Sequence, residues 1–264
     1  NSCLEKNPGD FILEEEGMLT LADAEQTLTG IYSAYMSGGL YSGYLTLTPD
    51  IQSDLVYAVQ GNSNAYGNIW QWDIRSTSAE IEAVYASLYT VIGRCNFFLD
   101  LVGDLRAGLT DDASIETLDF YTGEVYCARA LAYSELIKCF CKAYDPATAD
   151  SELGVVLRTS YFRKEPVVRA SLKESYELVI SDLEKAESLL DEKYDSFDSP
   201  YFADASANAI RGRVALYMQD WDNAVKYSTR LIESDAFSLA TARSYVTTSQ
   251  TFLDYMWTND TSYE

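Results

Sequence analysis

The chain has 264 residues, of which 47% are hydrophobic, so it is long enough to bury a sizeable core and has the composition of a globular protein. Its formal net charge of −22, from 41 acidic and 19 basic residues, repels phosphate backbones and excludes nucleic acid as an expected partner. Histidine is absent, which excludes Ser-His-Asp and Cys-His catalysis and every histidine-ligated metal site.

The first residues read as an extended leader, over residues 1–19, because an Asn-Pro-Gly-Asp turn signal is followed by three consecutive glutamates. The first helix is predicted to start after Thr20, with Asp23 three residues later as a variant of the capping box. Apolar residues then follow at spacings of three and four as far as Tyr35, and Gly38 and Gly39 are expected to end the helix.

Residues 38–76 form the part of the sequence without a sustained helical period, and they are rich in Gly, Ser, Asn, Gln and aromatic residues. Long irregular loops are uncommon in compact domains and are usually either functional or disordered. The number of large rings favours a functional loop over a disordered one. These rings belong to Tyr41, Tyr44, Tyr57, Tyr66, Trp70 and Trp72.

Two long helices are predicted next. The first starts with Thr77 as N-cap and Glu80 at the third helical position, and Gly103 is expected to end it. The second covers about residues 114–143 and is closed by an Asp-Pro pair. Residues 153–159 are short, apolar and β-branched, which indicates a brief strand or an extended crossing.

A further helix is predicted from Ser171, which forms a capping box with Glu174. Residues 203–234 read as two antiparallel helices similar to one tetratricopeptide-type repeat, with Gly212, Trp221 and Ala224 at its crossing positions. Residues 235–264 are less regular. The expected fold is therefore mainly all-α, with stacked helical hairpins of tetratricopeptide-like type and little β-structure.

Metal, cofactor and catalytic groups are not indicated. The five cysteines have no framework spacing, and Cys139 and Cys141 point in different directions on one helix, so we expect neither a disulfide nor a metal site. The adjacent acids Asp111 and Asp112 are interpreted as solvated rather than as a glycosidase pair, which needs a fixed separation across a cleft. We expect no cofactor and no enzymatic activity. No apolar run approaches the roughly 20 residues that cross a bilayer.

Five strings, taken in order, carry a family resemblance. They are Ser2-Cys3-Leu4 with Asn7-Pro8; Tyr85, Leu88, Tyr89, Ile92 and Asn96; Gly123 to Ala130 with Tyr133 and Leu136; Val168 to Ser171 with Tyr176, Asp182 and Leu183; and Arg213 to Tyr217 with Trp221 and Ala224. Together they resemble the SusD/RagB-like proteins, the surface glycan-binding lipoproteins of Bacteroidetes. The chain departs from the family pattern after Val156, where a Pro is common, and family members are longer.

The resemblance implies a non-enzymatic receptor for a polysaccharide or oligosaccharide. The receptor would act as a lid over a TonB-dependent outer-membrane transporter of the SusC type. Cys3 would carry the lipid that anchors the protein at the cell outer membrane, facing outward. Residues 20–264 would form a single SusD-like helical domain that lacks the family's C-terminal part. Glu124 and Arg129, which match the family's third helix, are interpreted as structural.

Trp70 and Trp72 are the candidate sugar platform, because a pyranose face stacks on an aromatic ring while its hydroxyls need polar partners. Residues two apart in extended backbone point to the same side, so the two rings are expected to share one surface. The loop supplies further candidate contacts in Asp54, Asn62, Asn64 and Tyr66. The alternative is that one or both tryptophans only anchor the loop onto the helices.

Two other functional classes remain open. A helical-repeat scaffold that binds a protein would present a contiguous groove on its helices, whereas a glycan receptor would concentrate exposed aromatic rings in residues 38–76. An enzyme such as a glycosidase is the third class, and turnover of a polysaccharide would identify it.

Overall fold

The computed structural model describes residues 17–57, 59, 61, 66–164, 167–196, 199–234 and 236–237. The described part is mainly helical, as predicted, with one small antiparallel sheet of β1 (Leu153–Val156) and β2 (Arg169–Ser171). The helices are α1 (Leu21–Tyr35), α2 (Tyr44–Gln52), α3 (Gly67–Trp70), α4 (Ala79–Gly108), α5 (Asp112–Phe140), α6 (Leu172–Leu189), α7 (Asp204–Tyr217) and α8 (Trp221–Ile232), with a 3₁₀ turn, η2, at Glu192–Tyr194.

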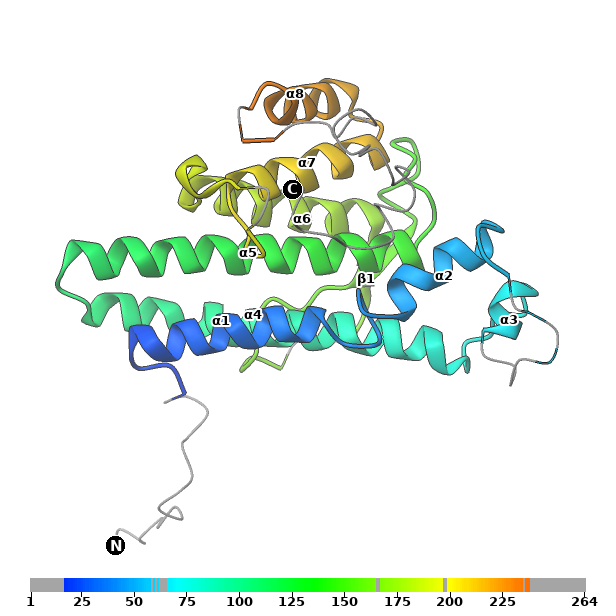
Figure 1. The fold of residues 1–264 in the computed structure, drawn as a ribbon, viewed down its shortest axis with the longest axis horizontal. Coiled ribbons are helices and arrows are strands. Elements are labelled where there is room, and N and C mark those ends of the chain that lie inside the picture. Colours follow the sequence, from blue (N-terminus) through cyan, green and yellow to red (C-terminus); the bar gives the residue numbers. More distant parts are fainter. Residues whose placement is uncertain are drawn as a thin grey trace, which may run out of the picture.

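The long helices α4 and α5 lie antiparallel, α1 packs beside them, and α6, α7 and α8 stack in order on the other side of α5 (Figure 1). One continuous apolar core joins α1 to α7. Its largest fully buried side chains include Leu88, Phe98, Tyr133, Leu136 and Leu183. Removing each such side chain from water contributes about 1.5–3 kcal/mol, so helix packing rather than intrinsic propensity holds the stack together.

Two predicted capping boxes are confirmed. Thr20 and Asp23 cap α1, and Ser171 and Glu174 cap α6, where the Glu174 carboxylate accepts from the Ser171 N–H at 2.8 Å. In both cases the N-cap and third-position side chains satisfy backbone N–H groups that the first turn leaves unpaired.

The bounds of α4 differ from the prediction at both ends. Its N-cap is Ser78 rather than Thr77, so Glu80 stands at the second helical position and the apolar Ile81 at the third, and no capping box forms. The Ser78 hydroxyl accepts from the Arg75 N–H. The helix also continues past Gly103 to Gly108. The extra turn is held by the buried Leu105 and by the Arg106–Asp119 ion pair to α5.

Residues 38–76 are more regular than predicted, since they hold the short helices α2 and α3. Pro49 lies inside α2 and removes one backbone donor, which hides a helical pattern in the sequence. Leu45 and Ile51 are buried and α2 contacts α4, so tertiary packing stabilises the helix.

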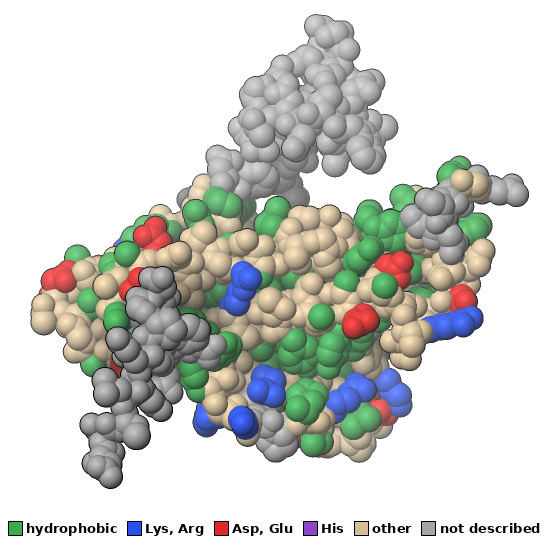
Figure 2. All heavy atoms as spheres, turned by 90° about the horizontal axis from the view of Figure 1, so that it is seen from below, with side chains coloured by type: hydrophobic (Ala, Val, Ile, Leu, Met, Phe, Trp, Pro, Cys, Tyr) green, Lys and Arg blue, Asp and Glu red, His purple; other side chains and the backbone are tan. Residues whose placement is uncertain are grey.

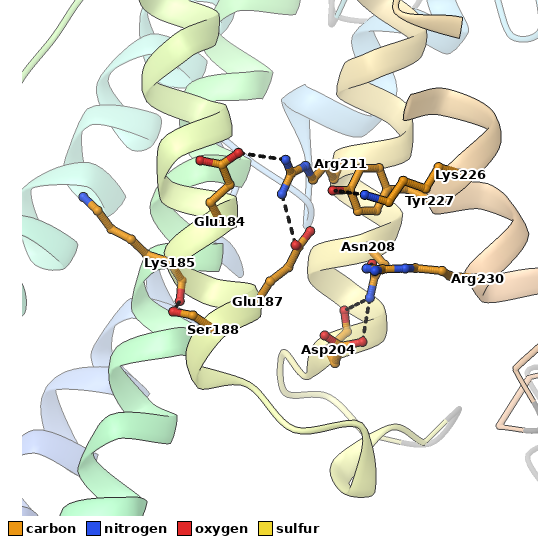
Figure 3. A network of polar contacts seen from close by, with 10 residues as sticks. All are labelled: Glu184, Lys185, Glu187, Ser188, Asp204, Asn208, Arg211, Lys226, Tyr227 and Arg230. Atoms are coloured by element: carbon orange, nitrogen blue, oxygen red, sulfur yellow. Dashed lines mark hydrogen bonds and ion pairs between the residues drawn. The ribbon is translucent and has the colours of Figure 1, made fainter. Parts of the chain in front are cut away.

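The stacked hairpins of α6, α7 and α8 share a polar interface (Figure 3). Arg211 on α7 bonds Glu184 and Glu187 on α6 at 2.9 and 3.0 Å. Its guanidinium also lies 4.6 Å from the ring centroid of the buried Tyr227 on α8. Together these contacts tie three consecutive helices with one side chain.

The repeat-like crossing of α7 and α8 is formed differently from the prediction. Gly212 does allow a close approach, because a Cβ there would lie 3.3 Å from the Ser228 hydroxyl. Trp221, however, is 60% exposed, and the buried ring at the interface is Tyr227. The prediction that Trp221 fills the crossing is therefore wrong.

Replacing Gly154 by alanine is expected to destabilise the protein by about 1–3 kcal/mol through overpacking. A Cβ at Gly154 would lie 2.1 Å from the Ser175 hydroxyl and 2.3 Å from the Ser171 carbonyl oxygen, where β1 meets the start of α6. Urea denaturation measures the effect. Gly103→Ala is the matched control, because nothing lies within 4 Å of its Cβ position and alanine favours the helix. Equal stabilities of the two variants would contradict the prediction.

Candidate ligand-binding site

The two charged residues matched to the family's third helix have structural partners, as predicted. Arg129 on α5 is buried and donates two bonds of 2.7 Å to the carboxylate of Asp182 on α6. It donates a third, of 2.8 Å, to Asn96 on α4. Glu124 is also buried, and it accepts a hydrogen bond from the Tyr32 hydroxyl of α1. These bonds fix α1, α4, α5 and α6 relative to one another.

A groove of about 1060 Å³ lies between α2, the start of α4, the end of α5 and β1. Its α2 wall carries Tyr44, Thr48 and Gln52, and the segment before α4 adds Ile74, Arg75 and Ser76. The opposite wall combines apolar and basic side chains. They are Lys138, Phe140, Lys142, Leu153, Arg169 and Tyr217.

The basic groups of the groove are held by partners within the protein. Lys138 pairs with Glu135, and Lys142 pairs with Glu152 at 2.8 Å. The Arg169 guanidinium donates to the carbonyl oxygens of Gly154, Phe140 and Leu153 at 2.5, 3.1 and 3.2 Å. The groove lining therefore combines apolar side chains with donors held in fixed positions, which suits a polar ligand with an apolar face.

The predicted platform residues lie beyond this groove, at the α3 end of the molecule. Trp70 is the last residue of α3 and is 37% exposed, and Trp72 is 64% exposed. Trp72 has φ of 59°, and its N–H bonds the Ile69 carbonyl, so the chain turns here. The expectation that extended backbone places both rings on one side is therefore wrong, because a helical end and a left-handed residue replace it.

The other predicted contacts are placed in part. Tyr66 is the N-cap of α3, and its ring packs edge-on against Tyr44, with centroids 5.7 Å apart. Tyr44 also lines the groove, so Tyr66 connects the predicted loop to it. Asp54 is exposed and does not line the groove. Asn62, Asn64 and the predicted lipid site Cys3 lie outside the described residues.

Backbone strain gathers in this same segment. Among the described residues, the non-glycine residues with positive φ are Asp54, Tyr66, Trp72 and Gln219, and the first three lie within 38–76. A left-handed conformation costs of order 1 kcal/mol or more for such residues and clusters at ligand sites. Hydrophobic side chains are also exposed at this end (Figure 2), including those of Leu55, Tyr57, Val59, Trp72 and Ile74.

A sequence model of the SusD-like family, described as starch-binding and associating with the outer membrane, matches residues 12–216. The chain belongs to the SusD-like family. This match confirms the resemblance, and it covers the described elements from α1 to α6 and all of α7 except its last residue, Tyr217.

Several relatives of this SusD-like chain agree with the assignment. A SusD-like protein of Formosa agariphila is 26% identical over 260 residues, 92% of this chain and 44% of the relative. A solved SusD superfamily protein of Bacteroides fragilis is 25% identical with a TM-score of 0.72, covering 87% of this chain and 53% of its own. A Bacteroides vulgatus structure named as a putative sugar binding protein is 24% identical with a TM-score of 0.73, covering 87% and 50%.

The likeness to the Bacteroides vulgatus structure shows the fold alone. The chain spans about half the length of the relatives it matches.

In the described part of the chain, no helix combines the length and hydropathy of a membrane span, and no cluster of three or more cysteine or carboxylate side chains is placed to hold a metal ion.

Sequence reasoning missed the second wall of the groove. Its residues at the end of α5 and in β1 lie about 90 positions or more after Tyr44 and become neighbours only through the packing of α2 against α4. The available signals were Arg169 and Tyr217, which line the groove and stand in strings matched to the family.

Proposed function

We propose that this chain is part of a non-enzymatic, surface-exposed lipoprotein that binds a polysaccharide or oligosaccharide and passes it to a SusC-like TonB-dependent transporter in the outer membrane. Cys3 would carry the lipid, and the protein would contact the membrane only through this lipid anchor. The observation that supports the proposal most directly is the gathering of exposed rings and left-handed backbone in residues 38–76, within a SusD-like fold.

The proposed ligand contacts are Trp70, Trp72, Tyr66, Asp54, Asn62 and Asn64. An exposed indole gives a weakly apolar pyranose face a surface to stack on, and the Asp54 carboxylate and the amides of Asn62 and Asn64 would bond its hydroxyls. Tyr66 and Tyr44 would continue this surface into the groove, whose volume is about 1060 Å³.

A protein-binding scaffold is the second candidate, and one observation favours it. The outer face of α8 exposes Trp221, Val225 and Ile232, and Leu216 and Tyr217 at the end of α7 are exposed beside it. An apolar helix face of this kind commonly packs against another protein surface. Exposed rings occur both on this face and in residues 38–76, so mutation of each is needed to separate the two functions.

Trp72→Ala is expected to weaken glycan binding about tenfold or more, since an exposed stacking ring acts as a hot spot at a ligand surface. Isothermal calorimetry and affinity electrophoresis against a panel of polysaccharides measure the loss, with Trp70→Ala alongside. Trp221→Ala is the matched control, because its indole is similarly exposed (60% against 64%) but lies on α8. Normal glycan binding by both loop variants, with weaker glycan binding by Trp221→Ala, would contradict the assignment of the site to residues 38–76.

A further inference from the structure

A second cavity, of about 310 Å³, lies between α1, the N-terminal half of α5, Tyr194 and residues 199–203. No residue lines both this cavity and the groove in the described part of the chain. Phe120, which lines the cavity, is 20 residues before Phe140, which lines the groove, and both belong to α5. At 1.5 Å per residue the two sites are roughly 30 Å apart along the helix. The cavity is therefore separate from the proposed glycan site.

Half of the residues that line the cavity are aromatic. Tyr32 contacts Tyr201 edge-on, with centroids 5.3 Å apart, and lies 5.4 Å from Phe202. Phe120 and Tyr194 are 4.5 Å apart. Because these rings brace one another across three elements, the wall is preorganised. The rings that line it are Tyr32, Phe120, Tyr121, Tyr194, Tyr201 and Phe202.

Two carboxylates, Glu25 and Glu124, also line the cavity, and no lysine or arginine does so among the described residues. Glu25 is exposed at the rim, whereas only 2% of Glu124 is accessible. The Tyr32 hydroxyl donates to Glu124 and accepts from the Phe202 N–H at 2.8 Å. Glu124 is thus held in place at the cavity wall without a cationic side chain to neutralise it.

A neighbouring contact shows that a ring of this wall accepts a cation. The Lys193 ammonium lies 4.9 Å from the Tyr194 ring centroid, within the range of a cation–π interaction. Lys193 itself is occupied by Glu116 and Asp191, at 2.9 and 3.0 Å. It is therefore not available to neutralise the carboxylates of the cavity.

We propose that this cavity binds a small organic cation, a quaternary ammonium or protonated amine with an apolar body. Aromatic walls attract such a cation through the negative faces of their rings, and the exposed Glu25 carboxylate supplies the opposite charge, joined by Glu124 where the pH is high enough to ionise it. An anionic ligand would find no positive side chain among the described residues that line the cavity. The volume is at the lower limit of ligand pockets, which suits a single small molecule rather than a polymer. The net charge of −22 adds a long-range attraction.

The test is calorimetric titration with choline and with 3,3-dimethyl-1-butanol, which has the same shape without the charge. Choline is expected to bind about fivefold or more tightly than its neutral analogue. Tyr201→Ala and Glu25→Gln should each weaken choline binding, and both side chains are exposed, so the fold is expected to be kept. Trp72→Ala should leave it unchanged, which separates this site from the proposed glycan site.

Three results would overturn the proposal. They are the absence of choline binding, equal affinities for choline and its neutral analogue, and unchanged choline binding in both cavity variants. Glucosamine and glucose form a second pair that tests the same chemistry on a sugar body. Tighter binding of glucosamine, lost in Tyr201→Ala, supports a cation site, whereas equal binding of glucose would assign the cavity to neutral sugars.

Discussion

Asp182→Ala is expected to lower the free energy of unfolding by about 3–5 kcal/mol, because it leaves the Arg129 guanidinium charged inside the core. The side chains of Arg129 and Asp182 are 5% and 0% exposed. Burial disfavours the guanidinium charge, while the bonds and attraction from Asp182 support it, so the pKa of Arg129 stays above its ordinary value. Alanine removes that support and leaves the desolvation cost.

The matched control for Asp182→Ala is Asp119→Ala. Asp119 also makes a two-bond pair with an arginine, Arg106, at 2.6 and 2.8 Å, but at the surface. Solvent screens that pair, so its loss is expected to cost about 0–1 kcal/mol. Guanidinium denaturation of the three proteins gives the comparison. Similar losses in both variants would mean that burial does not control the strength of the Arg129 pair.

A double variant, Arg129→Met with Asp182→Leu, separates the pair's net contribution from the cost of breaking it. Replacing a buried ion pair by apolar side chains of similar size is often close to neutral. The double variant is therefore expected to be more stable than Asp182→Ala. If the double variant lost as much unfolding free energy as Asp182→Ala, or more, the ion pair itself would stabilise the fold. The bond from Arg129 to Asn96 would then contribute as well as the bonds to Asp182.

The sequence predicted helices well where apolar spacing and capping agree. Thr20 with Asp23 and Ser171 with Glu174 mark helix starts because their side chains bond backbone groups within three residues, and such local bonds can be read from the chain. The prediction of Thr77 as N-cap was wrong because Ser78, one residue later, can take the same role. Gly103 failed as an end signal because contacts from Leu105 and Arg106 to distant residues outweigh its low helix propensity.

The candidate site was harder to predict than the helices. Composition alone located the exposed rings of Trp70 and Trp72, since clustered aromatic residues in an irregular segment are visible in the sequence. The geometry of the two rings could not be predicted, because it depends on α3 and on the left-handed backbone of Trp72. The groove wall formed by Lys142 and Arg169 depends on long-range packing, which no local pattern records.

The polar bonds in the core give the two proposed sites a rigid base. The Arg129 network joins α4, α5 and α6, and Glu124 joins α5 to α1 and, through Tyr32, to the segment at Phe202. Binding surfaces supported in this way lose little entropy when a ligand is bound. Stability and ligand binding are therefore coupled most closely at Glu124, which belongs both to a core network and to the wall of the second cavity.

Glu124→Gln is expected to flatten the pH dependence of stability between about pH 4.5 and pH 7. Burial raises the pKa of Glu124 from 4.5 to about 7, and the hydrogen bond from Tyr32 opposes this only in part. The folded state therefore holds a proton that the unfolded state releases in this interval, so stability falls as the pH rises through it. A pKa difference of this size corresponds to about 3 kcal/mol, fully present below pH 4.5 and lost above pH 7.

Urea denaturation at closely spaced pH values measures this effect as the difference between the wild-type protein and Glu124→Gln. Taking the difference removes the contribution of the other carboxylates, which is large in a chain of net charge −22. Glu25→Gln is the control, because Glu25 is exposed on the same cavity and should leave the slope unchanged. Parallel curves for the wild type and Glu124→Gln would show that Glu124 is ionised in the folded protein at pH 5, and that Tyr32 compensates its burial completely.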